Sequence, residues 1–260
     1  MFREGDWVIF TDNRVCMVER LTSHRRLHTH WGYIEHDDVL GREPGSIVET
    51  SRGKKLYVFA PTLADYVMHM PRKSGIIYPK DTGIILLWAD VFPGSRVLVG
   101  GVGSGGLLLA VLRQVGEKGR VVAYDVRQDM LDRAAENVKG YFGDLPPYLE
   151  LRLGDIYAPE DLEEDFDRVL LDVPEPWRAL ETVCRVLLPG GILCSYLPSI
   201  LQVARFENLL RRTESFALIE TLEVMMRGWH IEGRAIRPQH RMVGHTGFLT
   251  FARLSKGGAD

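Results

Sequence analysis

The sequence predicts an α/β protein, with an open and largely parallel sheet that follows a small N-terminal β domain. Apolar strand-like runs alternate with amphipathic helical stretches from about residue 96 to residue 213, as parallel βαβ units require. One of these runs ends in a glycine-rich turn, residues 97–106, which read VLVGGVGSGG. By contrast, residues 2–60 contain only short strand-like runs separated by polar turns. We therefore expect two domains, at residues 1–62 and 63–260.

The composition is that of a globular protein. The chain has 260 residues, of which 45% are hydrophobic and 26% charged, enough to bury a full core. A net charge of −3 neither indicates nor excludes nucleic acid, because phosphate binding depends on local basic patches. No apolar run approaches the ~20 residues that span a bilayer, and the start, MFREGDWVIF, lacks the apolar region of a signal peptide. The 3 cysteines suit a reducing compartment. We therefore expect a cytoplasmic protein with no membrane contact.

The N-terminal domain contains three strand-like runs, which read DWVIFTD, RVCMVERL and KKLYVFAP. Between the last two lies a polar segment, SHRRLHTHWGYIEHDD, whose cationic and imidazole side chains are His24, Arg25, Arg26, His28 and His30. This pattern is compatible with a solvated hairpin, with contacts to RNA phosphates or with a zinc site. Because adjacent guanidinium groups would repel a cation, we expect no metal here.

Two helices are expected before the glycine-rich turn. Residues 62–70 have a helical period, with Thr62 as N-cap and Asp65 completing a capping box, and Pro71 ends the helix. A second, mostly apolar helix is expected over residues 82–91. Tyr78 precedes a proline, so its backbone should be extended and its ring presented from a loop, either as packing or as a ligand contact.

The glycine-rich turn is the strongest functional signal in the chain. Gly101, Gly103 and Gly106 satisfy the pattern G-x-G-x-x-G between a strand and a helix that begins near Gly105. Glycines let backbone N–H groups approach a ligand closely, and the helix N-terminus adds unpaired donors and a favourable dipole. Asp125 follows twenty residues after Gly105, at the end of the strand VVAYD, where its carboxylate can accept both hydroxyls of a ribose. The turn therefore predicts a nucleoside cofactor.

Two further strands end in aspartate. Asp155 follows YLELRLG and Asp172 follows FDRVLL. Such a residue is often only the cap of the next helix. Since the carboxyl ends of parallel strands meet at one edge of the sheet, we expect Asp125, Asp155 and Asp172 to converge beside the glycine-rich turn.

The C-terminal part separates two possible cofactors. After an amphipathic helix (RALETVCRVLLPGG), a strand (ILCSYLP) and a helix over residues 200–213 come two strand-like runs, FALIETLEVMM and TGFLTFARL, split by a basic polar insertion. We expect these runs to pair as an antiparallel hairpin. The second βαβ half that an NAD-dependent enzyme of this size normally has is missing, so the sequence favours S-adenosylmethionine over a dinucleotide.

Five motifs read together resemble one family. They are YPKD (78–81), GGVGSGG (100–106), LDVPEPW (171–177), YLP (196–198) and VGHTGFL (243–249). In this order and spacing the chain is similar, over its whole length, to the bacterial and archaeal tRNA (adenine-N1)-methyltransferases that modify adenosine 58 of the T-loop. The resemblance implies a class I methyltransferase (Rossmann-like) sheet of seven strands with a reversed last strand, S-adenosylmethionine as methyl donor, tRNA as substrate and a homotetramer.

The resemblance also implies roles for individual residues. The methionine end of the cofactor would lie at the loop of Gly103, Ser104, Gly105 and Gly106, next to Gly101. Asp125 would bind the ribose hydroxyls and Asp155 the adenine amine, while Met130 stands where some members contact the cofactor and here offers only apolar packing. Asp172 would be the catalytic acidic residue beside the cofactor, and Tyr78 would lie near the target base.

Departures from the family leave a second function open. Many members carry an acidic residue where Val99 stands, Gln at Gly75 and Asn at Ser199. The alternative is a catalytically silent, RNA-binding subunit of a tRNA methyltransferase, against which the presence of all three strand-end aspartates argues. Candidate RNA contacts, each equally compatible with a solvated surface, are Arg25, Arg26, Arg72, Lys73, Lys80, Arg234, Arg237 and Arg241.

Overall fold

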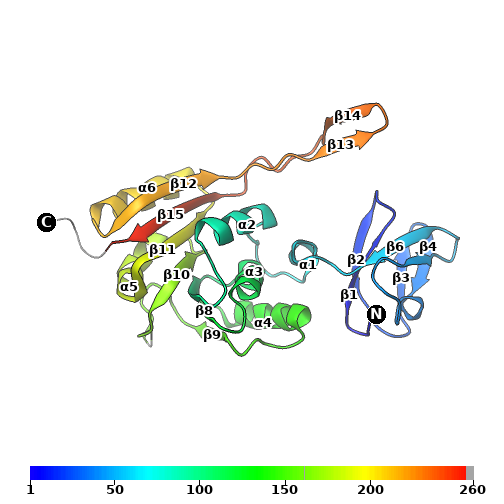
Figure 1. Cartoon of the computed structure of the whole chain (residues 1–260), viewed down its shortest axis with the longest axis horizontal. Coiled ribbons are helices and arrows are strands. Elements are labelled where there is room, and N and C mark those ends of the chain that lie inside the picture. Colours follow the sequence, from blue (N-terminus) through cyan, green and yellow to red (C-terminus); the bar gives the residue numbers. More distant parts are fainter. Residues whose placement is uncertain (161, 256–260) are drawn as a thin grey trace. The chain divides into compact units, whose positions relative to one another are not determined.

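The structure is a computed structural model that describes residues 1–160 and 162–255. It divides into two compact units, Met1–Met70 and Pro71–Asp260 (Figure 1). None of the helices in the described part of the chain is long and apolar enough to traverse a membrane.

The N-terminal unit is built around a small antiparallel sheet with the strand order β2-β1-β6-β5. Its strands are β1 (Trp7–Thr11), β2 (Cys16–Arg20), β5 (Ile47–Glu49) and β6 (Lys55–Phe59), so the three predicted strands are confirmed. The histidine-rich segment forms a separate hairpin of β3 (Arg26–Thr29) and β4 (Gly32–Glu35), which the short 3-10 helix η1 (His36–Asp38) follows. Alternating side chains such as Val8, Phe10, Leu56 and Val58 fill the core.

Helix α1 (Leu63–His69) has the predicted capping box, in which the Thr62 hydroxyl accepts from the Asp65 amide and the Asp65 carboxylate accepts from the Thr62 amide. The Tyr66 ring packs edge-on against Trp7, with 5.6 Å between ring centroids. Because of this contact α1 groups with the N-terminal sheet, and the units divide after Met70 rather than after residue 62.

The second unit contains a seven-stranded sheet with the order β12-β15-β11-β10-β7-β8-β9. Its strands are β7 (Arg96–Gly100), β8 (Arg120–Asp125), β9 (Leu149–Leu153), β10 (Phe166–Leu171), β11 (Leu187–Leu197), β12 (Phe216–Glu223) and β15 (Phe248–Leu254). β15 runs antiparallel to both β11 and β12, whereas the pairs from β11 to β9 are parallel. The reversed last strand and the pairing of the two C-terminal runs are therefore confirmed.

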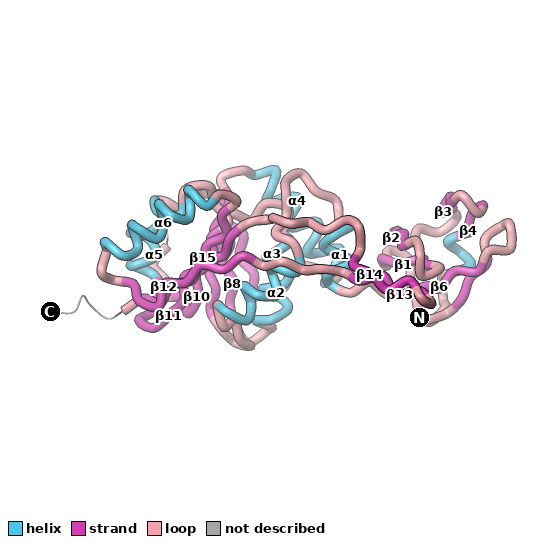
Figure 2. The backbone as a smooth tube through the Cα atoms, turned by 90° about the horizontal axis from the view of Figure 1, so that it is seen from above, coloured by secondary structure: helices cyan, strands magenta, loops and turns pink. Residues whose placement is uncertain are grey.

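Helices cover this sheet (Figure 2). They are α2 (Pro79–Trp88), α3 (Gly106–Val115), α4 (Gln128–Phe142), the 3-10 helix η2 (Pro176–Ala179), α5 (Leu180–Val186) and α6 (Ile200–Arg212). Three predicted boundaries were wrong. α2 begins at Pro79 rather than at residue 82, because proline is preorganised for the first helical position, and it ends at Trp88 rather than at residue 91. α5 stops at Val186, since residues 187–191 join β11 across a register shift between Phe166 and Arg168.

The basic insertion contains a hairpin that the sequence analysis missed. β13 (Trp229–Glu232) and β14 (Ala235–Pro238) pair antiparallel as a sheet of their own, separate from the seven-stranded sheet (Figure 1). Trp229, Ile231 and Ile236 on this hairpin are 58%, 72% and 64% exposed. An isolated two-stranded hairpin is only marginally stable in water, so this one needs a further packing partner.

Candidate active site

The glycine-rich turn joins β7 to α3 at the carboxyl edge of the sheet. Gly105 is the N-cap of α3 and has a positive φ of 90°. Gly101, with a φ of +86°, lies directly against the loop that leaves β10, and a Cβ there would overlap the carbonyl oxygen of Asp172. The Asp172 amide in turn donates to the Gly100 carbonyl at 2.7 Å. The loop of the glycines and the backbone of Asp172 are therefore packed as one unit.

This contact gives a first prediction. Gly101→Ala should destabilise the protein by more than Gly103→Ala, although both glycines have a positive φ. At Gly103 (φ +52°) alanine meets only the Ser74 hydroxyl, so the cost is that of the left-handed conformation, about 1–2 kcal/mol. At Gly101 the backbone of Asp172 must also move. Thermal unfolding of the two variants compares these costs, and equal losses of melting temperature would contradict the packing described here.

Asp125 ends β8 and organises the glycine loop. Its Oδ2 accepts from the Val102 and Gly103 amides at 3.1 and 3.0 Å, and its Oδ1 accepts from the Arg127 amide at 3.0 Å. A carboxylate offers about four acceptor positions. One acceptor position, on Oδ1, is therefore left for a single ribose hydroxyl. The sequence predicts that both ribose hydroxyls bind to this carboxylate.

The three strand-end aspartates line one cavity, as the strand order predicts. This cavity of about 230 Å³ is bounded by Gly101, Asp125, Asp155 and Asp172, with apolar walls from Val126, Ile156 and Val173. Carboxylates that can accept from hydroxyl and amino groups, apolar walls that can hold a planar base, and a loop that only glycine can form suit a nucleoside. The residues present therefore fit S-adenosylmethionine.

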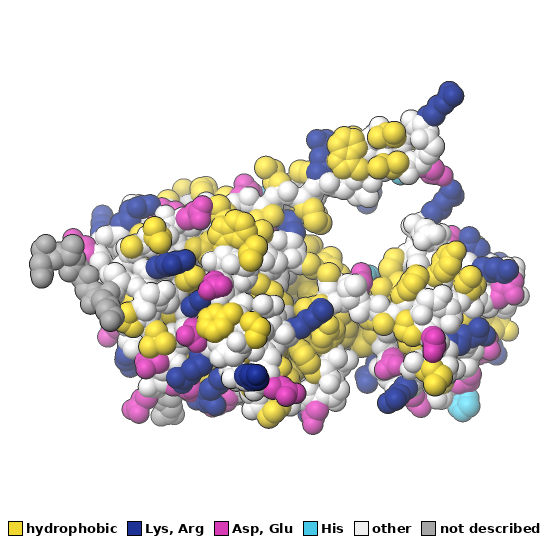
Figure 3. Space-filling view, viewed as in Figure 1, with side chains coloured by type: hydrophobic (Ala, Val, Ile, Leu, Met, Phe, Trp, Pro, Cys, Tyr) yellow, Lys and Arg dark blue, Asp and Glu magenta, His cyan; other side chains and the backbone are white. Residues whose placement is uncertain are grey.

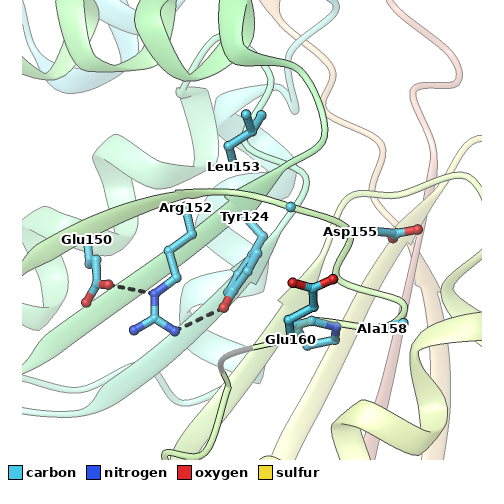
Figure 4. Close-up of a pocket in the computed structure, with 9 residues that line it drawn as sticks. Tyr124, Glu150, Arg152, Leu153, Asp155, Ala158 and Glu160 are labelled. Carbon is cyan, nitrogen blue, oxygen red and sulfur yellow. Dashed lines mark hydrogen bonds and ion pairs between the residues drawn. The ribbon is translucent and has the colours of Figure 1, made fainter.

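A larger cavity of about 650 Å³ lies at the β9 edge and shares Asp155 with the first (Figure 4). Its wall includes Arg152, whose Nε donates to Glu150 at 2.6 Å and whose Nη1 donates to the Tyr124 hydroxyl at 3.0 Å. The hydrogen bond to Glu150 is the main reason why the pKa of Arg152 lies above its usual value. This cavity includes neither the glycine loop nor Asp172, whereas the smaller one includes Gly101 and Asp172.

Asp172 is the electrostatically unusual group of the site. Burial, assisted by the charge of Asp125, raises the pKa of Asp172 to about 6. Desolvation disfavours its charged form, yet the group is still mostly ionised at pH 7. A carboxylate that is poorly solvated before ligands bind can interact strongly with a positive charge that develops nearby.

Two tyrosines come from the YPKD and YLP motifs. Tyr78 is the N-cap of α2, with the extended backbone (φ −67°, ψ 150°) that its position before a proline predicts. The Tyr196 hydroxyl donates to the Thr246 carbonyl at 2.6 Å. Burial first, and then the charges of Asp81 and Asp172 and the neighbouring Tyr78, raise the pKa of Tyr196 to about 12. Tyr196 belongs to the YLP motif, and its sequence position alone predicts no role for it.

Lys80 is not available to RNA, contrary to the sequence analysis. Its side chain is 7% exposed, and its Nζ donates to Asp81, to the Val224 carbonyl and to the Thr246 hydroxyl at 2.6–2.8 Å. The Thr246 hydroxyl donates onward to the second oxygen of Asp81 at 2.7 Å. This buried network connects the YPKD and VGHTGFL motifs on the α2 side of the site.

His245 lies beside this network. Its Nδ1 is 2.7 Å from a Glu223 carboxylate oxygen and its Nε2 is 2.9 Å from the Pro198 carbonyl. Glu223 first and Pro198 second raise the pKa of His245 above its usual value, because two acceptors favour the doubly protonated ring. His245 thus connects the ends of β11 and β12.

Two of the predicted cofactor residues, Ser104 and Met130, are buried. Ser104 is 1% exposed, and its hydroxyl accepts from the amides of Lys73 and Ser74. Met130 on α4 is 3% exposed and packs in the core. The Ser104 carbonyl also accepts from Asn137 Nδ2 at 2.8 Å.

A seven-stranded sheet with a reversed strand, and a glycine loop that faces acidic strand ends, define a class I S-adenosylmethionine-dependent methyltransferase. Residues 54–236 match the family described as the tRNA methyltransferase complex GCD14 subunit, and residues 1–48 match the TrmI-like N-terminal family. The chain belongs to the GCD14/TrmI family of tRNA methyltransferases.

Individual relatives agree with this assignment. The chain is 40% identical over 231 residues to the tRNA (adenine(58)-N(1))-methyltransferase TrmI of Thermus thermophilus, with 88% of this chain and 89% of that one covered. It is 31% identical to the TrmI of Methanocaldococcus jannaschii, described as acting at adenines 57 and 58, with 87% of each covered.

Two solved structures are also similar. One is the tRNA (m1A58) methyltransferase TrmI from Aquifex aeolicus, with a TM-score of 0.88, 28% identity and 98% and 99% coverage of this chain and that one. The other is described as a SAM-dependent O-methyltransferase from Thermotoga maritima, with a TM-score of 0.93, 33% identity and 100% and 96% coverage.

Proposed function

We propose that this protein transfers the methyl group of S-adenosylmethionine to N1 of adenosine 58 in the T-loop of tRNA. The observation that carries the proposal is the position of Asp172, a partly buried carboxylate whose backbone packs against the glycine loop and which lines the same cavity as Asp125 and Asp155. The similarity to TrmI enzymes over most of the chain supports the choice of substrate.

Methyl transfer requires that N1 of the adenine is aligned with the methyl group and that the positive charge developing on the ring is balanced. S-adenosylmethionine supplies an electrophilic methyl group when bound. N1 of a neutral adenine carries an in-plane lone pair and no proton, so no general base is needed for the transfer. Asp172 accepts the N6–H of the target adenine, which directs N1 toward the cofactor, and its charge stabilises the positive charge that grows on the ring.

The cofactor and the base occupy different parts of the site in this proposal. Asp125 accepts from the ribose and Asp155 from the adenine amine of the cofactor, while its methionine end lies against the glycine loop of residues 103–106. Because N1 of the target is not accessible inside the folded tRNA, the base must be extruded into the site. Tyr78 and Tyr196 then form the wall against which it packs.

Exposed arginines are the proposed contacts for the phosphates of the tRNA. Arg25, Arg234, Arg237 and Arg241 are exposed. Arg26 is paired with Glu35 at 2.7 Å and lies 4.5 Å from the centre of the Tyr33 ring, so it is less free to bind a phosphate. With tRNA as substrate, we place the protein in the cytoplasm.

We also propose a homotetramer in which the β13–β14 hairpin packs on a second copy of the chain. Ile231 and Ile236 are directly opposite each other and, with Trp229, expose an apolar face (Figure 3). Ile231→Asp/Ile236→Asp should yield smaller particles in light scattering after size exclusion. His230→Asp on the opposite side of β13 is the matched control. An unchanged mass for the double variant would exclude this interface.

An assay with unmodified tRNA tests the proposed reaction. Incubation with S-adenosylmethionine, followed by nucleoside mass spectrometry and mapping of the position, should give 1-methyladenosine at position 58. Titration calorimetry with S-adenosylmethionine separates this function from the alternative of a silent RNA-binding subunit, which would bind tRNA but no cofactor. Binding of NADH without S-adenosylhomocysteine would instead indicate an oxidoreductase.

A further inference from the structure

The segment before α2 is fastened across the glycine loop by two buried polar side chains. Ser104 Oγ accepts from the amides of Lys73 and Ser74 at 3.0 and 3.2 Å. Asn137 on α4 donates from Nδ2 to the carbonyls of Pro71 and Ser104 at 2.9 and 2.8 Å. Ser104 and Asn137 are 1% and 2% exposed, so this part of the chain is fixed relative to the loop.

The other hydrogen bonds of Ser104 determine which of the two serine hydroxyls donates to the other. Ser104 Oγ and Ser74 Oγ are 3.1 Å apart, and either could donate on distance alone. A hydroxyl has two acceptor positions and one proton. Both acceptor positions of Ser104 are taken by backbone amides, so Ser104 donates and Ser74 accepts. The proton of Ser74 is left over, and no other hydrogen bond of its hydroxyl occurs within residues 1–160 and 162–255.

This free proton lies at the glycine loop. Ser74 Oγ is 3.0 Å from the point where a Cβ of Gly103 would be. The amides of Val102 and Gly103 are already used by Asp125, so they cannot bind an anion there. Lys73 Nζ is 3.9 Å from Asp129, which partly neutralises it. Ser74 is therefore an available neutral donor beside the N-terminus of α3, where the helix dipole favours negative charge.

We propose that Ser74 binds the carboxylate of the methionine moiety of S-adenosylmethionine through its hydroxyl, and that Ser104 orients this hydroxyl. The inference rests on the proposed function, since it names a further residue for the same cofactor. The Ser74 hydroxyl donates a hydrogen bond at the methionine end of the cofactor, opposite to the adenine end that Asp155 binds. Ser74 thereby discriminates between nucleosides that carry the amino-acid chain and those that lack it.

Calorimetry with two probes tests this role. Ser74→Ala should weaken binding of S-adenosylhomocysteine about tenfold, in the range of a hydrogen bond to a charged group. It should leave binding of 5′-methylthioadenosine unchanged, because that nucleoside has no carboxylate. Ser74→Thr keeps a hydroxyl and should restore most of the lost affinity. Ser46→Ala, whose hydroxyl donates to the Glu43 carbonyl in the N-terminal unit, is the matched control.

The outcomes are distinct. Equal weakening of both probes by Ser74→Ala would mean that Ser74 only shapes the loop, and an unchanged affinity for both would mean that it contacts neither; each result overturns the inference. If the unmodified protein binds neither probe, the proposed function itself fails. Thermal unfolding of each variant checks that the second unit is folded before binding is compared.

Discussion

Asp172→Ala should lower the rate of methyl transfer about 100- to 1,000-fold, the effect of removing one preorganised electrostatic contact to a transition state. The affinity for S-adenosylhomocysteine should change little, because Asp172 acts on the target base and the cofactor has other partners in Asp125 and Asp155. Single-turnover methylation of tRNA at saturating cofactor, together with calorimetry, separates the two quantities. Near-native single-turnover rates would reject the catalytic role.

The pH profile adds a second test of Asp172. Because its pKa is about 6 and its ionised form is the productive one, the rate should fall about tenfold per pH unit below pH 6. Asp172→Asn keeps the shape of the side chain but cannot ionise, so the decrease of the rate below pH 6 should disappear.

The raised pKa of Asp172 in the folded state means that the ionised group destabilises the fold at pH 7, so Asp172→Asn should also unfold at a higher temperature. That advantage should disappear below the ordinary value of 3.8, where both states of Asp172 are neutral.

Lys80→Met should lower the free energy of unfolding of the second unit by about 3–5 kcal/mol, the cost of leaving a buried charge without its partner. Asp81 is completely buried and its carboxylate would retain only Thr246 among the partners described here. Urea denaturation followed by far-ultraviolet circular dichroism measures the loss. Lys139→Met, on the exposed last turn of α4, is the matched control and should change stability little.

A double variant distinguishes the loss of the ion pair from the loss of the lysine side chain. Lys80→Met/Asp81→Asn removes both charges, so it should be more stable than Lys80→Met alone even though it carries one more substitution. A double variant that is less stable than the single one would show that Asp81 is tolerated without Lys80, and would contradict the account of this network.

Much of the fold could be predicted because strands and turns leave local signals. The positions of Gly101, Gly105 and Asp125 follow from a strand that turns into a helix and from the spacing to the next strand end. The convergence of Asp125, Asp155 and Asp172 follows from the parallel order of their strands. Hydrophobic periodicity thus sets the sheet, and the sheet places the acidic residues at one edge.

Other features depend on partners that are distant in the sequence. Lys80 reads as a surface cation, yet it is buried by Val224 and Thr246, more than 140 positions away. The short α5 results from pairing of residues 187–191 with β10, which overrides their place after a helical pattern. Hydrogen bonds from the glycine loop to Asp125 and from residues 73 and 74 to Ser104 also leave no periodic signal. These contacts arise only once the sheet has formed.

The close packing of Gly101 against the Asp172 carbonyl affects which substitutions related enzymes can tolerate around the site. Since the distance between the glycine loop and the backbone of Asp172 is set by two main-chain segments in direct contact, it does not depend on the rotamers of the surrounding side chains. Side chains around the site can therefore be exchanged in a related enzyme while this distance stays constant.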